Sequence, residues 1–127
     1  MISANALVLI GEDEPDNQVI LQTVVESLVG VRAEVAGDGL AVLDSVTRER
    51  PDMILLDLMM PRLDGFQVTR KLKGDPTTAS IPIVAVSAMA RPDDREAALA
   101  AGCDEFVRKP FELDDLEAVI RTYLDNH

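Results

Sequence analysis

Hydrophobic residues follow two alternating patterns along the chain. Short and almost purely apolar runs, such as residues 53–56, are bounded by glycine, proline and charged residues. Between them lie longer segments in which apolar residues recur every three or four positions. The first pattern is typical of buried strands and the second of helices with one face on a core. We therefore predict five strands, at residues 6–10, 32–36, 53–56, 83–86 and 105–107.

A helical pattern follows each predicted strand. The first includes residues at spacings of three and four, namely Ile20, Leu21, Val24, Val25 and Leu28. One predicted helix covers residues 40–48, and the others include residues 20–28, 68–72, 97–101 and 113–124. Glycines at positions 30, 74 and 102 mark three of the helix ends, because glycine readily ends a helix.

The order of these elements predicts five βα units in one α/β domain. Strands that are apolar throughout are expected when helices cover both faces of a parallel sheet. Right-handed crossovers then give a doubly wound, three-layer sandwich with a five-stranded parallel sheet. The sequence has no repeat or linker, so we expect a single domain over residues 1–127 with a core at about 5–125.

Composition limits the partners and the compartment. The chain has 23 acidic and 12 basic residues and a net charge of -11, which repels nucleic acids and anionic membranes. Neither is expected as a partner. Cys103 is the only cysteine, so no intrachain disulfide can form. The chain shows no secretion signal and no apolar run long enough to span a bilayer, so a cytoplasmic location is expected.

The residues just after the predicted strands carry the chemistry. In open parallel sheets, ligands bind beyond the carboxyl ends of the strands. Glu12 and Asp13 follow the first strand, Asp57 the third, Ser87 the fourth and Lys109 the fifth. Each has an ordinary alternative as a helix cap, a loop acid or a surface lysine. Such unrelated causes would not bring all of them to the same edge of the sheet.

Carboxylates gathered at one edge repel each other and need a cation. Oxygen ligands without histidine or a nearby cysteine favour magnesium over zinc or copper. With part of the charge neutralised, one carboxylate can attack phosphorus, while a lysine and a hydroxyl stabilise the phosphoryl oxygens. The pattern therefore predicts magnesium-dependent phosphoryl transfer to Asp57.

Four segments resemble the receiver domains of response regulators in bacterial two-component systems. They are VLIGEDEPDN, DMILLDLMMPRLDG, PIVAVSA and GCDEFVRKPF, which occur in the family's order and span essentially the whole chain. The resemblance implies a flavodoxin-like, or CheY-like, fold. It also implies a phosphorelay signalling switch rather than an enzyme, although the domain assists its own phosphorylation and dephosphorylation.

The resemblance assigns roles to the predicted site. Asp57 is the phosphoacceptor, and Asp13 and Asp57 ligate Mg²⁺ together with the backbone carbonyl of Met59. Glu12, where aspartate is more common, assists through water. Lys109 pairs with the phosphoryl oxygens.

The resemblance also implies a switch and a set of residues that tune rates. Ser87 binds the phosphoryl group, and Phe106 changes rotamer when Ser87 moves. The residues expected to modulate rates are Met59, Met89 and Ala88. The residues expected to shape the flanking loops are Pro61, Gly65 and Pro110, the last after a cis peptide bond.

The implied partners are proteins. A histidine kinase or a histidine phosphotransfer protein donates the phosphoryl group, and a downstream protein reads the changed surface, with the domain a monomer or a weak dimer. The only histidine, His127, is the last residue, so an internal phosphohistidine relay is not expected. We expect Cys103 to be a small core residue that opens a buried strand.

Three rival functions remain open. A phosphatase of the haloacid dehalogenase type also uses a strand-end aspartate, but it carries a second acid where this chain has Met59. A pseudo-receiver would have lost part of the acid cluster or the lysine. A mononucleotide site would need a glycine-rich loop after the first strand, where this chain has GEDEPDN. The domain could also belong to a hybrid histidine kinase.

Overall fold

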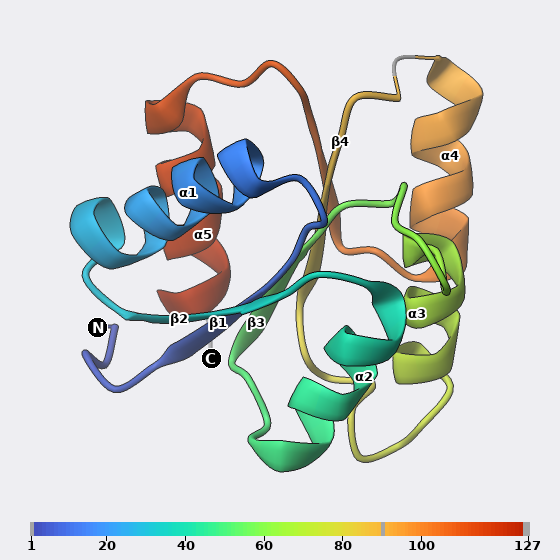
Figure 1. Cartoon of the computed structure of the whole chain (residues 1–127), viewed down its shortest axis with the longest axis horizontal. Coiled ribbons are helices and arrows are strands. Elements are labelled where there is room, and N and C mark those ends of the chain that lie inside the picture. Colours follow the sequence, from blue (N-terminus) through green and yellow to red (C-terminus); the bar gives the residue numbers. More distant parts are fainter. Residues whose placement is uncertain (1, 90, 126–127) are drawn as a thin grey trace.

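The computed structural model describes residues 2–89 and 91–125, and His127 lies outside them. Within this range the elements alternate as predicted (Figure 1). The strands are β1 (Leu7–Gly11), β2 (Arg32–Ala36), β3 (Met53–Leu56), β4 (Ile83–Ser87) and β5 (Glu105–Arg108). The helices are α1 (Pro15–Thr23) with its π-helical continuation η1 (Val24–Val29), α2 (Gly39–Arg48), α3 (Gly65–Lys73), α4 (Pro92–Ala101) and α5 (Leu113–Asp125).

The five strands form one parallel sheet in the order β2-β1-β3-β4-β5. Helices α1 and α5 cover one face, and α2, α3 and α4 cover the other (Figure 1). The predicted doubly wound (βα)5 fold is confirmed. Successive strands are added toward one side of the sheet from β1 to β2 and toward the other side from β3 onward. The loops after β1 and β3 therefore diverge and leave space for a site at the carboxyl ends of these strands.

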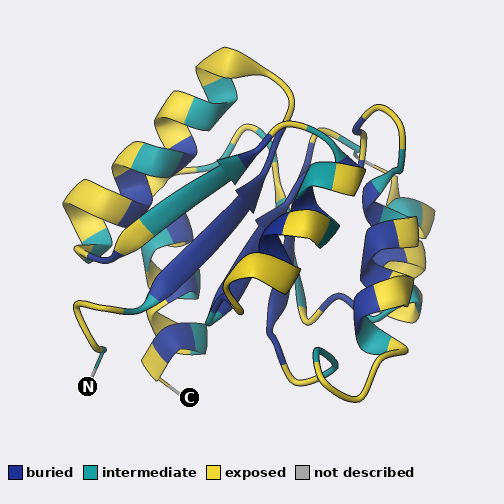
Figure 2. Ribbon diagram, turned by 60° about the horizontal axis from the view of Figure 1, so that its bottom comes forward, coloured by how far each residue is buried: buried dark blue, intermediate teal, exposed yellow. Residues whose placement is uncertain are grey.

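Two cores explain why the strands are apolar throughout. Residues of one strand alternate between the faces of the sheet. Ile54 and Leu56 of β3 pack beneath α2, α3 and α4, whereas Met53 and Leu55 pack beneath α1 and α5. The central strands are accordingly buried along their whole length (Figure 2).

The apolar residues predicted to form one buried stripe along the first helix are only partly buried. Leu21, Val24 and Val25 lie in the core, but Ile20 is 43% exposed and Leu28 is 39% exposed. For Leu28 the cause is a change of helix type, whereas Ile20 lies in α1, ahead of this change. The N–H of Gly30 bonds to the carbonyl of Val25, five residues earlier, and this wider turn displaces Leu28 from the α-helical period of the stripe.

The surroundings of Cys103 differ from the prediction in one respect. Cys103 is a buried core residue, as expected, and burial raises the pKa of its thiol. However, it precedes β5 by two residues, and β5 is half-exposed rather than buried. The reason is that β5 is an edge strand with β4 as its only neighbour, so one side of it lacks a covering strand.

Close backbone packing holds the loop after β3. A Cβ atom on Gly65 would lie 2.6 Å from the Cα of Leu58 and 2.7 Å from the carbonyl oxygen of Asp57, so no other residue fits there. The Asp64 side chain caps the next helix by accepting a hydrogen bond from the Gln67 N–H. The Lys109-Pro110 peptide bond is cis, as expected.

None of the helices in residues 2–89 and 91–125 is long and apolar enough to cross a membrane.

Candidate functional site

Backbone hydrogen bonds bring the predicted site residues to one edge of the sheet. The Asp57 N–H bonds to the Gly11 carbonyl at 2.8 Å, and the Lys109 N–H bonds to the Ser87 carbonyl at 2.8 Å. The parallel ladder therefore continues past the strand ends and fixes the start of each loop. The positions of the acidic side chains that follow β1 and β3 depend on this register.

Three carboxylates meet at this edge. Glu12, Asp13 and Asp57 each offer an oxygen atom, and these atoms lie within 4.8 Å of one another. Glu12 is fully buried, Asp57 is 9% exposed and Asp13 faces solvent. The cluster is thus buried at Glu12 and Asp57 and open to solvent at Asp13. Like charges so close together favour a bound cation.

Lys109 is the positive charge of the site. Its Nζ lies 2.7 Å from Glu12 Oε1 and 3.2 Å from Asp57 Oδ2. Burial lowers the pKa of Lys109, but its hydrogen bond to Glu12 and the charge on Asp57 outweigh burial and leave the pKa above its ordinary value. The lysine therefore stays protonated at neutral pH.

Glu12 is held on both oxygens. Oε1 accepts the hydrogen bond from Lys109, and Oε2 accepts one from the Glu14 N–H at 3.1 Å. Burial raises the pKa of Glu12, against the lowering effect of these two hydrogen bonds. The structure thus places Glu12 beside Lys109 as well as beside the other acids, a contact that the sequence analysis did not predict. Gln18, which donates to the Glu12 carbonyl at 2.7 Å, was also missed.

Asp57 and Ser87 each accept a hydrogen bond from the turn that follows them. Asp57 Oδ1 accepts from the Met59 N–H at 2.9 Å, and Ser87 Oγ accepts from the Met89 N–H at 3.2 Å. Ser87 is fully buried. In this arrangement the Ser87 hydroxyl interacts with its own turn.

The residues expected to tune rates border the site. Met59 and Met89 line a hollow of 540 Å³ that also contains Asp13. Ala88 is exposed and lines a separate groove together with Lys109. Phe106 is half-buried and packs against the core beneath α2, α3 and α4.

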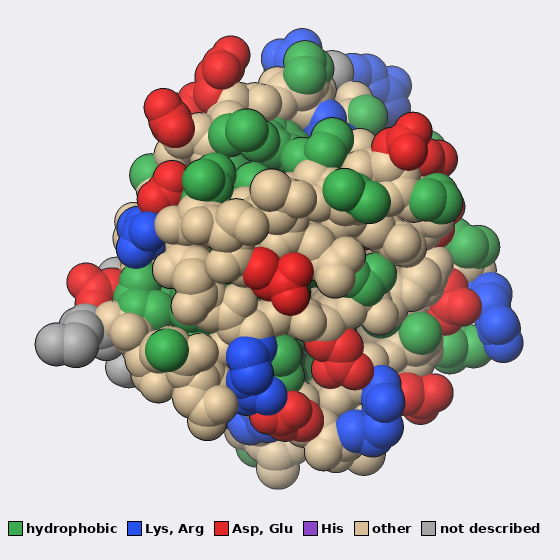
Figure 3. Space-filling model, turned by 60° about the vertical axis from the view of Figure 1, so that its left-hand side comes forward, with side chains coloured by type: hydrophobic (Ala, Val, Ile, Leu, Met, Phe, Trp, Pro, Cys, Tyr) green, Lys and Arg blue, Asp and Glu red, His purple; other side chains and the backbone are tan. Residues whose placement is uncertain are grey.

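The groove beside Ala88 is a feature that the sequence analysis missed. It has a volume of 600 Å³ and runs between α1 and the start of α5. Val19, Ile20 and Leu113 line it and are 62%, 43% and 48% exposed. Figure 3 shows hydrophobic side chains gathered in the upper part of this side of the molecule. The signal was present in the sequence, because Val19 and Ile20 extend the apolar stripe of the first helix beyond one face.

Comparisons with known proteins identify the family of the chain. The model of the response regulator receiver domain family matches residues 8–121. Response regulator MprA of Mycobacterium leprae (strain TN) is 40% identical over 111 residues, which are 86% of this chain and 48% of that protein. MprA of Mycobacterium tuberculosis (strain ATCC 25618 / H37Rv) is 40% identical over 111 residues, 86% of this chain and 47% of that protein. The chain thus spans about half the length of these relatives.

Solved structures of receiver domains superpose over nearly the whole chain. The receiver domain of sensor histidine kinase PA1611 from Pseudomonas aeruginosa PAO1, with magnesium in its active-site cleft, has a TM-score of 0.88 and 34% identity, and the match covers 96% of this chain and 99% of that one. The receiver domain of a signal transduction histidine kinase from Syntrophus aciditrophicus has a TM-score of 0.88 and 30% identity, covering 95% and 91%.

The chain belongs to the response regulator receiver domain family. Its place in two-component signalling follows from this membership.

Proposed function

We propose that Asp57 accepts a phosphoryl group and that the resulting aspartyl phosphate switches the partner-binding surface. The observation that carries the proposal is the position of Asp57. It lies 3.2 Å from the Lys109 ammonium and within 4.8 Å of two other carboxylates, at an edge that Asp13 leaves open to solvent. This arrangement supplies a nucleophile, a positive charge and a cation site around one point.

We propose Mg²⁺ as the cation. The clustered side-chain donors are all carboxylate oxygens, the donor type that this ion prefers. Asp13, Asp57 and the Met59 carbonyl would bind it, with Glu12 assisting through water. When bound, the ion offsets the charge of the carboxylates and of the incoming phosphoryl group.

The proposed transfer needs few movements. An oxygen of Asp57 attacks the phosphorus of a phosphohistidine, the P–N bond breaks, and Lys109 pairs with a phosphoryl oxygen. Ser87 would then leave the Met89 N–H, its present partner, and bind the phosphoryl group. Phe106 would move into the space that Ser87 vacates, which changes the surface of α4 and β5.

We propose that a helix of the phosphodonor protein binds in the groove beside α1. The donor histidine must reach Asp57, and Lys109 and Ala88 belong both to the edge of the site and to the groove. Val19 and Ile20 present exposed apolar area there, which an apolar helix face would cover. The small side chain of Ala88 would leave room for the donor imidazole.

For the downstream protein we propose the face around Phe106. Met89, Pro92 and Phe106 line a hollow of 360 Å³ between α4 and β5, bordered by Arg91, Arg95 and Arg108. On a chain with a net charge of -11, three arginines around one apolar hollow favour an acidic partner segment.

The remaining parts of the proposal concern the type of activity, the oligomeric state and the location of the protein. We propose a switch rather than a phosphatase, because the position of a second catalytic acid is Met59. We also propose a monomer or weak dimer in the cytoplasm, one domain over residues 1–127, and no nucleic-acid contact by this strongly acidic domain.

The decisive experiment is the intact mass after incubation with acetyl phosphate and Mg²⁺. We expect one added phosphoryl group per chain, lost in Asp57→Asn and absent without Mg²⁺. Asp16→Asn is the matched control, since Asp16 is an exposed acid in the first turn of α1, and it should label like the natural protein. Equal labelling of Asp57→Asn, or steady release of phosphate over many turnovers, would refute the proposal.

A further inference from the structure

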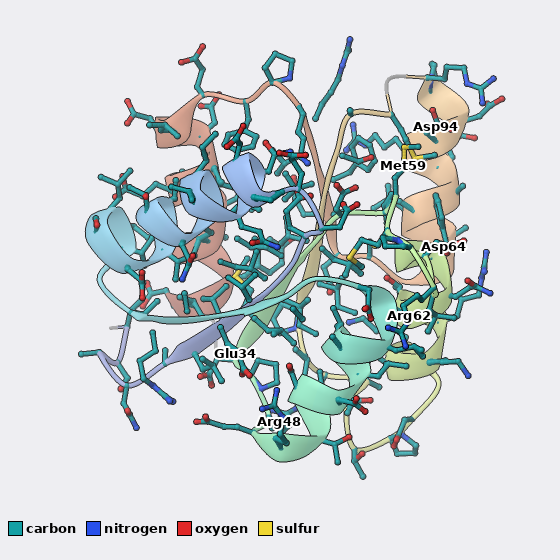
Figure 4. All side chains as sticks on the ribbon, in the orientation of Figure 1. Glu34, Arg48, Met59, Arg62, Asp64 and Asp94 are labelled. Carbon is teal, nitrogen blue, oxygen red and sulfur yellow. The ribbon has the colours of Figure 1, made fainter. Side chains whose placement is uncertain are left out.

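Methionines are concentrated at the mouth of the acid cluster. The chain has five methionines, and three of them, Met59, Met60 and Met89, line the 540 Å³ hollow that contains Asp13. Figure 4 shows the labelled Met59 side chain at the sheet edge, on the side of α4. Three thioethers therefore border the opening through which solvent reaches the carboxylates.

The three methionines differ in their packing. Met60 is 8% exposed and belongs to the core, and Met89 is half-buried against the same core. Met59 is 61% exposed and is absent from both hydrophobic clusters. Its side chain thus adds little to core packing, although its backbone N–H donates to Asp57. A thioether so exposed is accessible to small oxidants.

We infer that Met59 is an oxidation site through which peroxide shortens the lifetime of the phosphorylated domain. The inference rests on the proposed phosphorylation of Asp57. In the reaction, the Met59 sulfur attacks one oxygen of hydrogen peroxide and the O–O bond breaks. The sulfur gains that oxygen as a sulfoxide and is oxidised by two electrons, while the other oxygen leaves as water.

The consequence follows from the position of Met59 next to the reacting carboxylate. The Met59 N–H donates to Asp57 Oδ1 at 2.9 Å, so its side chain starts two bonds from an atom that contacts the phosphoacceptor. A thioether is apolar with a weak acceptor, whereas a sulfoxide oxygen is a strong acceptor. The oxidised side chain gives a hydrolytic water a strong hydrogen-bond acceptor where the natural thioether offers only a weak one. One such bond corresponds to about a five-fold faster loss of phosphate.

The test compares decay before and after oxidation. The metal-free protein is treated with dilute hydrogen peroxide, the peroxide is removed with catalase, and peptide mapping locates each sulfoxide. The protein is then phosphorylated with acetyl phosphate and Mg²⁺, the donor is removed, and the loss of the phosphoryl mass is followed. The same steps are applied to Met59→Leu and to Met60→Leu, a control from the same hollow, and each variant is compared with its own unoxidised form.

We expect Met59 to be oxidised first among the three and decay of the oxidised natural protein to be about five-fold faster. Met60→Leu should show the same acceleration and Met59→Leu none, and methionine sulfoxide reductase should restore the slow decay. Unchanged or slower decay after Met59 oxidation, acceleration that persists in Met59→Leu, or a Met59 that stays reduced would each overturn the inference. Failure of the unoxidised protein to take up phosphate would instead refute the proposed function on which it rests.

Discussion

The two ends of the sheet each hold a largely buried lysine in an ion pair, but only at one end does a single carboxylate balance that lysine. At the amino-terminal end, Lys73 donates to Asp104 at 3.0 Å and to the carbonyls of Ala79 and Ile81. Asp104 in turn accepts from the Ile83 N–H at 2.8 Å. One positive charge meets one negative charge, and hydrogen bonds satisfy both. This pair ties α3 to the starts of β4 and β5.

At the carboxyl-terminal end, one lysine faces three acids. Lys109 contacts Glu12 and Asp57, and Asp13 lies within the same cluster without a lysine contact. The negative excess stabilises nothing in the folded domain by itself, since like charges repel. The comparison teaches that unbalanced charge, rather than the presence of an ion pair, separates a functional site from a structural one in this fold.

Replacing each lysine by methionine should have the largest effect and tests directly whether the two ends of the sheet differ in function. Lys109→Met should slow phosphoryl uptake from acetyl phosphate by roughly 10²-fold, because it removes the positive charge that stabilises the transferring group. Lys73→Met should leave the uptake rate of the folded protein unchanged but lower the free energy of unfolding by about 1–3 kcal/mol, since Asp104 and two carbonyls lose a donor. Phosphorylation rates and urea unfolding measure the two effects. If Lys73→Met slowed phosphorylation and Lys109→Met only lowered stability, the functional and structural roles given to the two ends would be wrong.

The next largest effect should come from the lifetime of the phosphorylated state. Met59→Asn and Met89→Glu each place a polar group at the mouth of the acid cluster, where it can orient a water molecule. We expect dephosphorylation to be about five-fold faster in each, the scale of one hydrogen bond. Decay of the phosphoryl mass in Mg²⁺ measures this, and unchanged or slower decay in both variants would show that the methionines do not shield the site.

Removing charge from the unbalanced end should also raise stability without metal. Asp13→Asn relieves the repulsion among the three acids, and about 1 kcal/mol of relief corresponds to a Tm increase of a few degrees in a domain of this size. The Tm increase that Mg²⁺ gives to the natural protein should be lost. Thermal unfolding with and without Mg²⁺ is the measurement, and Asp16→Asn is the control. A sharp fall of the metal-free Tm in Asp13→Asn would make Asp13 a structural residue.

The smallest expected signal is a change on the face around Phe106. Addition of beryllofluoride and Mg²⁺ should shift backbone amide resonances in α4, β5 and α5, because Ser87 and Lys109 lie on the segments that flank this face. The amides around Lys73, at the balanced end, serve as an internal control and should move least. Shifts confined to the loop after Asp57 would argue against a switch.

The sequence predicted the fold closely, since apolar runs and the turn residues that bound them suffice to define a parallel sheet. Two of the five strands, β2 and β3, have the predicted bounds, and the others extend by one residue or shift by one. The strand ends then identified Glu12, Asp13, Asp57, Ser87 and Lys109. The roles of these residues stay predictions until they are measured.

Other features were not visible in the sequence because they depend on three-dimensional packing. The contact between Lys109 and Glu12 depends on the reach of two side chains from opposite ends of the chain. The π-helical turn at η1 lies against α5, a late element of the chain, where Arg121 donates to the Leu28 carbonyl at 2.7 Å. The half-exposed state of β5 depends on the strand order, which the pattern of single strands does not fix.

The distance along the chain between Glu12 and Lys109 has a consequence for protein synthesis. These residues are 97 positions apart, and the second belongs to the last βα unit. A nascent chain on the ribosome presents its acids and Asp57 long before the lysine that faces them has been translated. Under the role proposed for Lys109, such a chain lacks the charge that stabilises phosphoryl transfer, and signalling competence requires that the last βα unit has emerged and folded onto the sheet.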